Sequence, residues 1–219
     1  MEAFPLRSIT RALRMANSKG MGFQSLSYRF DLSNALSATG IWFKQDASPA
    51  SEPVTIVLND NGYQAAGQQV FDSLSTGHEV LALDLLFNGA TRPEVPDSSD
   101  WELLVDSSGD RSLGLEAAQL LSIVHWLRST QGDRVIQVET SGIRNQVIAL
   151  VAAALEPEGF SDLDNQNGMK SLAYLLDKPV PLRAAPELFC LDLYKDFDID
   201  SLSALASPVK VTQTSIVGQ

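Results

Sequence analysis

The chain has 219 residues, 44% of them hydrophobic and 20% charged, which is the balance of a single globular domain. Its 27 acidic and 16 basic residues give a formal net charge of −11, which argues against nucleic acids and anionic membranes as partners. The single cysteine, Cys190, rules out an internal disulfide, and the two histidines, His78 and His125, rule out a histidine-rich metal site.

The first twenty residues carry apolar side chains at helical spacing. Leu6, Ile9, Leu13 and Ala16 recur every three or four positions, so we predict an amphipathic helix within residues 1–20. Three arginines interrupt the apolar positions, so the segment does not resemble a secretory signal peptide. No apolar run reaches the ~18 residues of a membrane-spanning helix. The sequence leaves the location of the protein in the cell open.

The next elements follow in a regular order. Residues 23–44 alternate apolar and polar side chains around a polar turn, which predicts an antiparallel hairpin. Residues 54–216 alternate strand-like apolar runs with helical stripes, and the strands are expected at 54–58, 80–83, 135–138, 169–176 and 209–216. This order predicts one α/β domain over residues 1–219, a three-layer sandwich with a mostly parallel sheet that follows the hairpin.

Polar residues follow several of these strands. Ligands of such sheets bind outside the carboxyl ends of the strands, so these residues are candidates for a binding site. The candidates for binding a polar ligand such as a sugar are Asp60, Asn61, Asp84, Arg92 and Arg144, and we expect Asn59, Asn88 and Ser141 beside them. In the alternative interpretation, which is somewhat favoured, these side chains only cap strand ends and form ion pairs.

Two common ligand motifs are incomplete in the sequence. Residues 62–69 have the two-glycine spacing of a P-loop but carry glutamines where the lysine and hydroxyl are required. Asp196, Asp198 and Asp200 alternate as in a calcium loop, but serines replace its essential glycine and glutamate. Asp200 is more simply the N-cap of a helix that begins at Ser201. We therefore expect neither a nucleotide nor a metal cofactor.

The junction after the strand at 135–138 has the context of catalysis. It reads ETSGIRNQ and leads into an apolar helix over residues 143–155. A strand, a sharp turn and a buried helix in this order are typical of a nucleophile elbow.

The whole chain resembles the α/β-hydrolases, most closely the branch of acetyl xylan esterases (carbohydrate esterases) and dienelactone-hydrolase-like proteins. The matching segments cover most of residues 24–214 and read PVTIVLNDNG, GHEVLALDLLFNGATRP, RSLGLEAAQLLSIVHWLRS, RVIQVETSGIRNQVIALVAAALEP and LYKDFDIDSLSALASPVKV. The resemblance implies a three-layer α/β-hydrolase-like sandwich and, in the family, carboxylic-ester hydrolysis by a serine, an acid and a histidine.

The sequence departs from this family at the catalytic positions. Counting back from the helix places the nucleophile of the family's G-x-S-x-G motif at Ile143, or at Gly142 with a slip of one residue. Ser141 stands at the first glycine of the motif. The family's histidine follows a late strand, but no histidine follows His125, and His78 precedes a strand at the end opposite the site. A serine without a base is a poor nucleophile.

Three functional hypotheses follow. The favoured one is a catalytically inactive esterase-like domain with a structural, carbohydrate-binding or partner-binding role, for example beside another hydrolase domain of the same polypeptide. The second is an active ester hydrolase in which Ser141 works with an acid such as Asp84 or Glu139. The third is an α/β binding module unrelated to esterases. Turnover of p-nitrophenyl acetate that is lost in Ser141→Ala would separate the second from the first.

Overall fold

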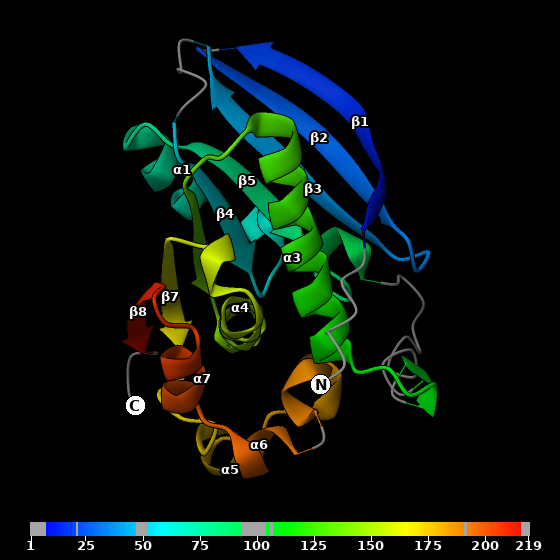
Figure 1. Ribbon diagram of the computed structural model, residues 1–219, viewed down its shortest axis with the longest axis vertical. Helices are drawn as coiled ribbons and strands as arrows, with labels where there is room; N and C mark the ends of the chain where they lie inside the picture. Colours follow the sequence, from blue (N-terminus) through cyan, green and yellow to red (C-terminus); the bar gives the residue numbers. More distant parts are fainter. Residues whose placement is uncertain are drawn as a thin grey trace.

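The computed structural model contains one eight-stranded sheet with strand order β1-β2-β3-β5-β4-β6-β7-β8 (Figure 1). It describes residues 8–20, 22–46, 52–92, 104–105, 107–190 and 192–215. The strands are β1 (Ile9–Gly20), β2 (Phe23–Leu32), β3 (Ser37–Gln45), β4 (Val54–Asn59), β5 (Glu79–Asp84), β6 (Ile136–Ser141), β7 (Asp162–Gly168) and β8 (Lys210–Ser215). The longer helices are α1 (Gly67–Ser75), α3 (Ser112–Gln131), α4 (Ile143–Leu155) and α7 (Ile199–Leu205).

The predicted hairpin and the first three core strands are confirmed. Strands β2 and β3 pair in antiparallel fashion, and β4 pairs in parallel with β5 and β6. All six residues of β4 and all six of β5 are buried, as continuous apolar runs require when helices cover both faces of a parallel sheet. The predicted final strand is also present, as β8, so the mostly parallel sheet after an antiparallel hairpin is as expected.

The predicted N-terminal helix is wrong, because residues 9–20 form β1 and pair with β2 along their whole length. Irregularities near Thr10 and Met15 break the ladder and interrupt the two-residue alternation of a regular strand. As a result Ile9 and Ala12, three residues apart, both pack on the core. Bulges in a strand can thus imitate helical spacing in a sequence. The first seven residues lie outside the described part of the chain.

The strand predicted at 169–176 is also misplaced. The strand is β7, directly before the predicted range, and that range instead contains the start of the short helix α5 (Tyr174–Asp177). Within β7, Leu163 and Asn165 are buried while Asp162, Asp164 and Gln166 are partly exposed. The strand therefore has one apolar residue facing the core, too few to be found by hydrophobic pattern.

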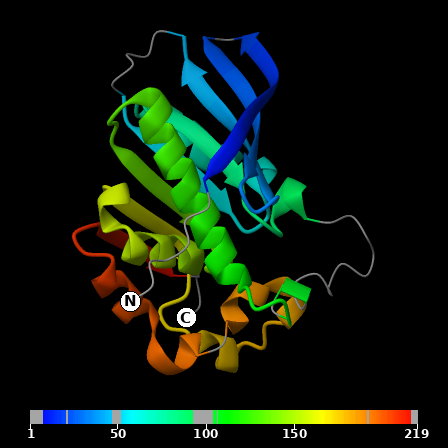
Figure 2. The same cartoon turned by 45° about the vertical axis from the view of Figure 1, so that its right-hand side comes forward.

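Helices cover the two faces of the sheet unequally. The helices α3, α4 and α7 lie on one face, and α1 packs on β3, β4 and β5 from the other, so the centre of the sheet has three layers (Figure 1). Figure 2 shows β1–β3 extending beyond the helices at one end of the molecule. On β6, β7 and β8 the second face is polar, and its side chains include Gln137, Glu139, Asp162, Asp164, Gln166 and Thr212.

The core is largest on the face covered by α3 and α4. It includes Phe30 and Trp42, which are almost fully buried, and Trp126 of α3 packs edge-on against both rings at centroid distances of 5.0 and 5.8 Å. These contacts anchor the long helix α3 to the antiparallel strands. In the described part of the chain, no helix is long and apolar enough to cross a membrane.

Candidate functional site

The turn between β6 and α4 consists of a single residue, Gly142. Its φ of 110° and ψ of 170° lie where side chains are rarely tolerated, and its N–H donates to the carbonyl oxygen of Gln166 at 3.0 Å. Ile143 is already the first residue of α4. Of the two positions considered for the nucleophile, the sharp strand-to-helix turn is therefore at Gly142, which has no side chain.

The carboxylate of Asp60 fills the space directly above this turn. Asp60 follows β4, and its N–H donates to the carbonyl oxygen of Ser141 at 2.9 Å. A Cβ atom built on Gly142 would lie 2.2 Å from Oδ2 and 2.3 Å from Cγ of Asp60, far inside van der Waals contact. No larger residue fits at position 142 while Asp60 keeps this position.

The same carboxylate accepts hydrogen bonds from N–H groups in the first turn of α4. Oδ2 of Asp60 accepts from the Arg144 N–H at 3.0 Å, and Oδ1 accepts from the N–H and the side-chain amide of Asn145, both at 2.9 Å. These N–H groups have no partner within the helix, and the helix dipole favours a negative charge beside them. Burial nevertheless raises the pKa of Asp60, and the hydrogen bonds from Asn145 and Arg144 offset this only in part.

The next two residues of α4, Asn145 and Gln146, both use their side chains in packing. Asn145 is bound to Asp60, and Gln146 is fully buried. The Gln146 amide donates to the carbonyl oxygen of Met169 at 2.9 Å and accepts from its N–H at 2.8 Å. Gln146 therefore joins α4 to the segment after β7.

A buried ion pair closes the other side of α4. The guanidinium of Arg144 donates to both carboxylate oxygens of Glu187, whose side chain is fully buried. Burial would lower the pKa of Arg144, but the charge of Glu187 more than compensates and raises it. Burial raises the pKa of Glu187 despite its arginine partner. The sequence interpretation missed Glu187; its only signal is a lone acid in the apolar stretch around 184–190.

Arg144 and Asp60 face a cavity of about 510 Å³ at the carboxyl edge of the sheet. We call it the Asp60 cavity, and its lining is Asp60, Asn61, Arg92, Ile143, Arg144, Val180, Pro181, Ala184 and Ala185. The structure thus brings four of the five candidate binding residues together around one space. The apolar wall from residues 180–185 was not anticipated from the sequence.

The fifth candidate, Asp84, does not line this cavity but connects two loops beside the sheet edge. Its Oδ1 accepts from the Tyr63 N–H and its Oδ2 from the Ala90 N–H, both at 2.7 Å, so it holds the loops after β4 and β5 together. Asn88 and Asn59 also serve this connection, because the Asn88 amide donates to the Asn59 carbonyl oxygen at 2.9 Å. These three residues therefore agree with the alternative interpretation, in which the polar side chains cap strand ends.

In the loop at 62–69 the Tyr63 N–H is bound to Asp84, and the DFDID segment (residues 196–200) caps a helix. Asp198, not Asp200, caps α7, which begins at Ile199 and not Ser201, and its carboxylate accepts from the Ile199 and Leu172 N–H groups at 2.7 Å. Burial opposes these bonds, yet they lower the pKa of Asp198. Among the described residues, no three His, Cys, Asp or Glu side chains are grouped so that they could hold a metal.

Comparisons with known proteins match this architecture to esterases. No family model matches the sequence, and no curated protein does. Among solved structures, a Bacteroides fragilis NCTC 9343 protein with the provisional name acetyl xylan esterase superposes over 96% of this chain with a TM-score of 0.76 and 15% identity. The acetyl xylan esterase from Paenibacillus sp. R4 superposes over 90% at a TM-score of 0.63 and 12% identity. The glucuronoyl esterase from Solibacter usitatus covers 95% at 0.64 and 13%.

The chain has an α/β-hydrolase fold. At these identities the likeness concerns the fold alone. The chain spans 63% of the length of the first of these proteins, 66% of the second and 68% of the third. The β6–α4 turn occupies the place of the nucleophile elbow in this fold.

Of the remaining triad candidates, Ser141 lies directly before this elbow and the two histidines have partners elsewhere. Ser141 precedes the turn, and its hydroxyl accepts from the Asn167 side-chain amide at 3.2 Å; it does not line the Asp60 cavity. His78 is bound to the Thr55 hydroxyl at 2.7 Å beside the start of β5, and His125 of α3 pairs with Glu156 at 2.6 Å. Neither histidine contacts a residue of the elbow among the hydrogen bonds of the described chain.

Proposed function

We propose that this chain is an acetyl xylan esterase-like α/β-hydrolase domain that does not hydrolyse esters and binds a polar ligand, such as a carbohydrate, in the Asp60 cavity. The carrying observation is the place of the Asp60 carboxylate, 2.2 Å from where a Cβ on Gly142 would stand. An acyl-transfer enzyme needs a nucleophile at this turn. Here the position has no side chain, and the Asp60 carboxylate fills the space beside it.

Within the described ranges of the chain, no base is hydrogen-bonded to Ser141, and this supports the same proposal. Ser141 has an amide as its partner, and an amide cannot take up a proton from its hydroxyl. Glu139 lies on the same strand but accepts from the Ser73 hydroxyl at 2.7 Å. The esterase-like fold in turn argues against a binding module unrelated to esterases.

The lining of the Asp60 cavity supports a polar ligand. Asn61 and Arg92 are exposed at its rim and offer an amide and a guanidinium, while Val180 and Pro181 form an apolar wall. A volume of about 510 Å³ is within the usual range of small-molecule sites. Hydroxyl groups on an apolar ring skeleton, as in a sugar, fit such a mixed lining. The proposal also includes a neighbouring hydrolase domain, whose product would be the ligand of the Asp60 cavity.

Two assays test the two halves of the proposal. Hydrolysis of p-nitrophenyl acetate by the purified chain should equal that of Ser141→Ala, and clear turnover lost in Ser141→Ala would overturn the inactive assignment. Binding of acetylated xylo-oligosaccharides, followed by saturation-transfer NMR, should be lost in Arg92→Ala. As a matched control, Arg29→Ala removes an exposed arginine on β2 outside the cavity and should leave binding unchanged. Equal binding by all three proteins, or none by the original chain, would contradict a ligand in this cavity.

A further inference from the structure

The eight-stranded sheet has two outer edges, and the strands that form them differ. β1 lies at one edge and β8 at the other, and within the described part of the chain neither pairs with a further strand on its outer side (Figure 1). An unpaired edge presents a row of N–H and C=O groups that can bind another strand. Proteins therefore protect such edges with bulges, charged side chains or covering elements.

The edge formed by β1 has two of these protections. Its ladder with β2 is irregular near Thr10 and Met15, and bulges of this kind bend and twist a strand. Arg11, Arg14 and Lys19 are exposed along the strand, and their like charges repel a second copy of it. β1 is therefore a poor edge for pairing with another chain.

The edge formed by β8 has neither protection. Its ladder with β7 is regular from Lys210 to Thr214, and the one shift at its end lies in β7, at Asn167. The strand reads KVTQTS, so its first residue is its only charged one. Thr212, Gln213 and Thr214 are exposed, and threonine and valine favour the extended conformation. β8 is therefore well suited to pair with a further strand.

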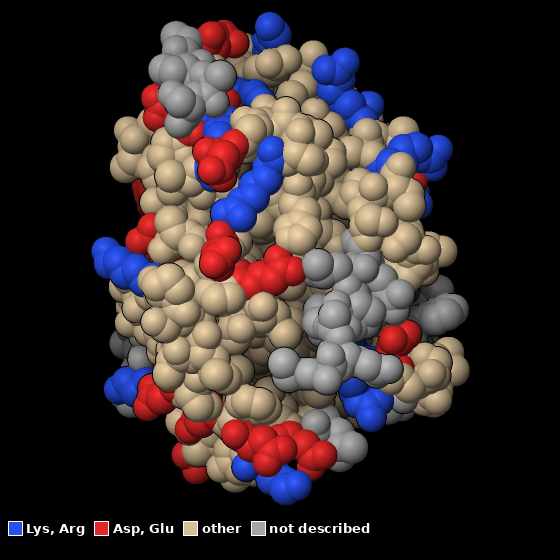
Figure 3. Space-filling model, viewed as in Figure 1, with Lys and Arg blue, Asp and Glu red and all other residues tan. Residues whose placement is uncertain are grey.

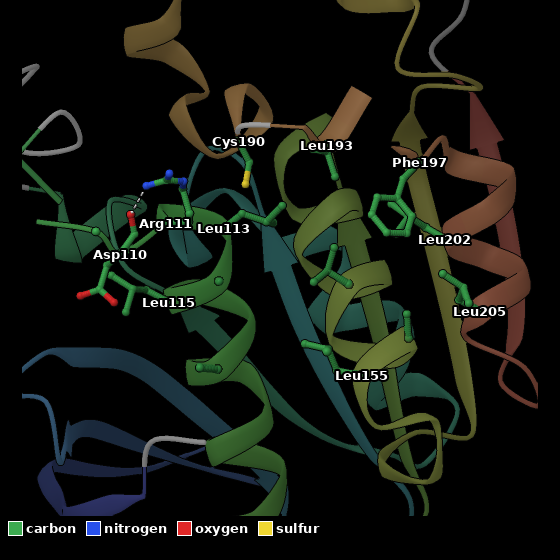
Figure 4. Close-up of a pocket in the computed structure, with 15 residues that line it drawn as sticks. Asp110, Arg111, Leu113, Leu115, Leu155, Cys190, Leu193, Phe197, Leu202 and Leu205 are labelled. Atoms are coloured by element: carbon green, nitrogen blue, oxygen red, sulfur yellow. Dashed lines mark hydrogen bonds between the residues drawn. The ribbon is translucent and has the colours of Figure 1, made fainter. Parts of the chain in front are cut away.

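The helix α7 covers one face of β8 and pairs with none of its backbone. Val211 packs on the core, and the Gln213 amide donates to the Ser203 hydroxyl of α7 at 3.1 Å. Figure 4 shows α7 beside this strand, with Leu202 and Leu205 directed from the helix into the cavity between α7 and α4. The backbone of β8 on its outer side thus stays without a strand partner among the described residues.

We propose that the chain forms a symmetric dimer in which the β8 strands of two copies pair in antiparallel fashion and join the two sheets into one. A two-fold axis perpendicular to the sheet makes the two contact surfaces identical and places residues of the same face opposite each other. The pairing is then centred on Thr212, which faces its own copy, or on Gln213, with Thr212 opposite Thr214. Both registers place threonine opposite threonine, a favourable cross-strand pair.

The charges near β8 favour a second copy at this edge. The chain has a formal net charge of −11, so two copies attract each other only where acidic side chains stay apart. The nearest acids on the polar face, Asp162 and Asp164, belong to β7. In the dimer the two β7 strands are three strand spacings apart, about 14 Å, which exceeds the Debye length of about 8 Å at physiological salt. Between them lie only β8 strands, which carry no acid.

Analytical ultracentrifugation of the purified chain tests the dimer. We expect a mass of twice the 23.7 kDa of one chain at high micromolar concentration and of one chain after dilution. Thr212→Lys/Thr214→Lys places lysines opposite lysines in both registers and should raise the dissociation constant at least tenfold. As a matched control, Ala16→Lys/Ser18→Lys adds the same two charges at exposed positions of β1 and should leave it unchanged.

Hydrogen exchange of the original chain gives a second measurement that does not depend on a variant. Amides of residues 210–215 should exchange more slowly as the protein concentration rises, whereas those of residues 9–20 should not change. A chain that stays monomeric at all concentrations would overturn the proposal, even if a strand of a different protein then binds β8. A dimer that the β8 variant leaves intact, or that the β1 variant dissociates, would also overturn it.

Discussion

The Asp60 carboxylate has two roles at the turn between β6 and α4. It caps the first N–H groups of α4, and it fills the space that a nucleophile on the preceding turn would need. Both roles depend on one carboxylate, which accepts from the N–H groups of Arg144 and Asn145 and lies 2.2 Å from the place of a Cβ atom on Gly142.

Gly142 is the residue most sensitive to this arrangement. Gly142→Ala introduces a Cβ 2.2 Å from Asp60 Oδ2 at a φ of 110°, so it combines backbone strain with a steric clash. We expect it to lower the free energy of unfolding by at least about 3 kcal/mol, the sum of typical costs for strained backbone and overpacking. Urea unfolding monitored by tryptophan fluorescence measures this value.

A matched glycine gives the control for this measurement. A Cβ added to Gly114 of α3 would meet no atom within 4 Å, and the residue lies within a helix, so Gly114→Ala should stabilise the protein by up to about 1 kcal/mol. If the two alanine variants unfold at the same urea concentration, Asp60 does not fill the space above Gly142.

The ion pair between Arg144 and Glu187 leads to a second prediction at this scale. Arg144→Met leaves the fully buried Glu187 carboxylate without its partner, so we expect a loss of about 3–5 kcal/mol in the free energy of unfolding. The double variant Arg144→Met/Glu187→Met removes both charges and should recover most of that loss. Thermal unfolding of the two variants checks this. A double variant as unstable as the single one would show that the pair's hydrogen bonds, and not the stranded charge, carry the effect.

The candidate binding residues could be selected from the sequence because parallel strands end at one edge of the sheet. Asp60, Asn61, Arg92 and Arg144 do line one cavity, although they come from the turn after β4, the loop after β5 and the first turn of α4. The sequence left the nucleophile position open between Gly142 and Ile143, because the residue at which the strand turns into the helix is decided by backbone geometry. Glu187 was missed because nothing in its local sequence indicates that a residue 43 positions away, Arg144, neutralises it.

At the scale of elements, the sequence was informative where strands are buried on both faces. The runs that became β4 and β5 were recognised because continuous apolar residues have few alternatives. β1 was not predicted because bulges break its alternation of apolar and polar residues. β7 was not predicted because its second face is polar. Both are strands away from the centre of the sheet, where tertiary pairing decides the conformation.

The polar face of β6 and β7 predicts an unusual dependence of stability on pH. Burial raises the pKa of Glu139 above its ordinary value of 4.5, and the nearby charges of Asp164 and Asp72 raise it further, against the hydrogen bond from Ser73. The folded state therefore holds the proton more tightly than the unfolded state. As pH rises from 4.5 through the raised pKa, this group's contribution to stability is lost.

Glu139→Gln tests that dependence because glutamine does not titrate and can still accept from the Ser73 hydroxyl. We expect the stability of the variant relative to the original chain to increase as pH rises through this window and to become constant above it. Asp31→Asn is the control of opposite sign, since hydrogen bonds from Arg11 and Arg29 lower the pKa of Asp31. Its relative stability should instead fall as pH rises from below the lowered pKa towards 3.8. A pH-independent difference for Glu139→Gln would contradict the raised pKa.

At the scale of the whole molecule, the net charge leads us to expect no polyanionic partner. Figure 3 shows acidic and basic side chains distributed over this face, with a group of acidic side chains at its lower end. The formal net charge of −11 makes attraction to nucleic acid unfavourable over most of the surface. The fold itself was foreseen from the order of elements, and the esterase structures that it resembles extend well beyond the matched length.

We propose that the elbow of this α/β-hydrolase fold holds no activated nucleophile. A fluorophosphonate forms a covalent phosphonyl adduct with an activated serine and does not require a particular acyl substrate. Intact-mass spectrometry of the purified chain after incubation with this probe tests the claim most directly. We predict an unchanged mass, both for the original chain and for Ser141→Ala. A stoichiometric adduct on the original chain that maps to Ser141 and is absent from Ser141→Ala would contradict it.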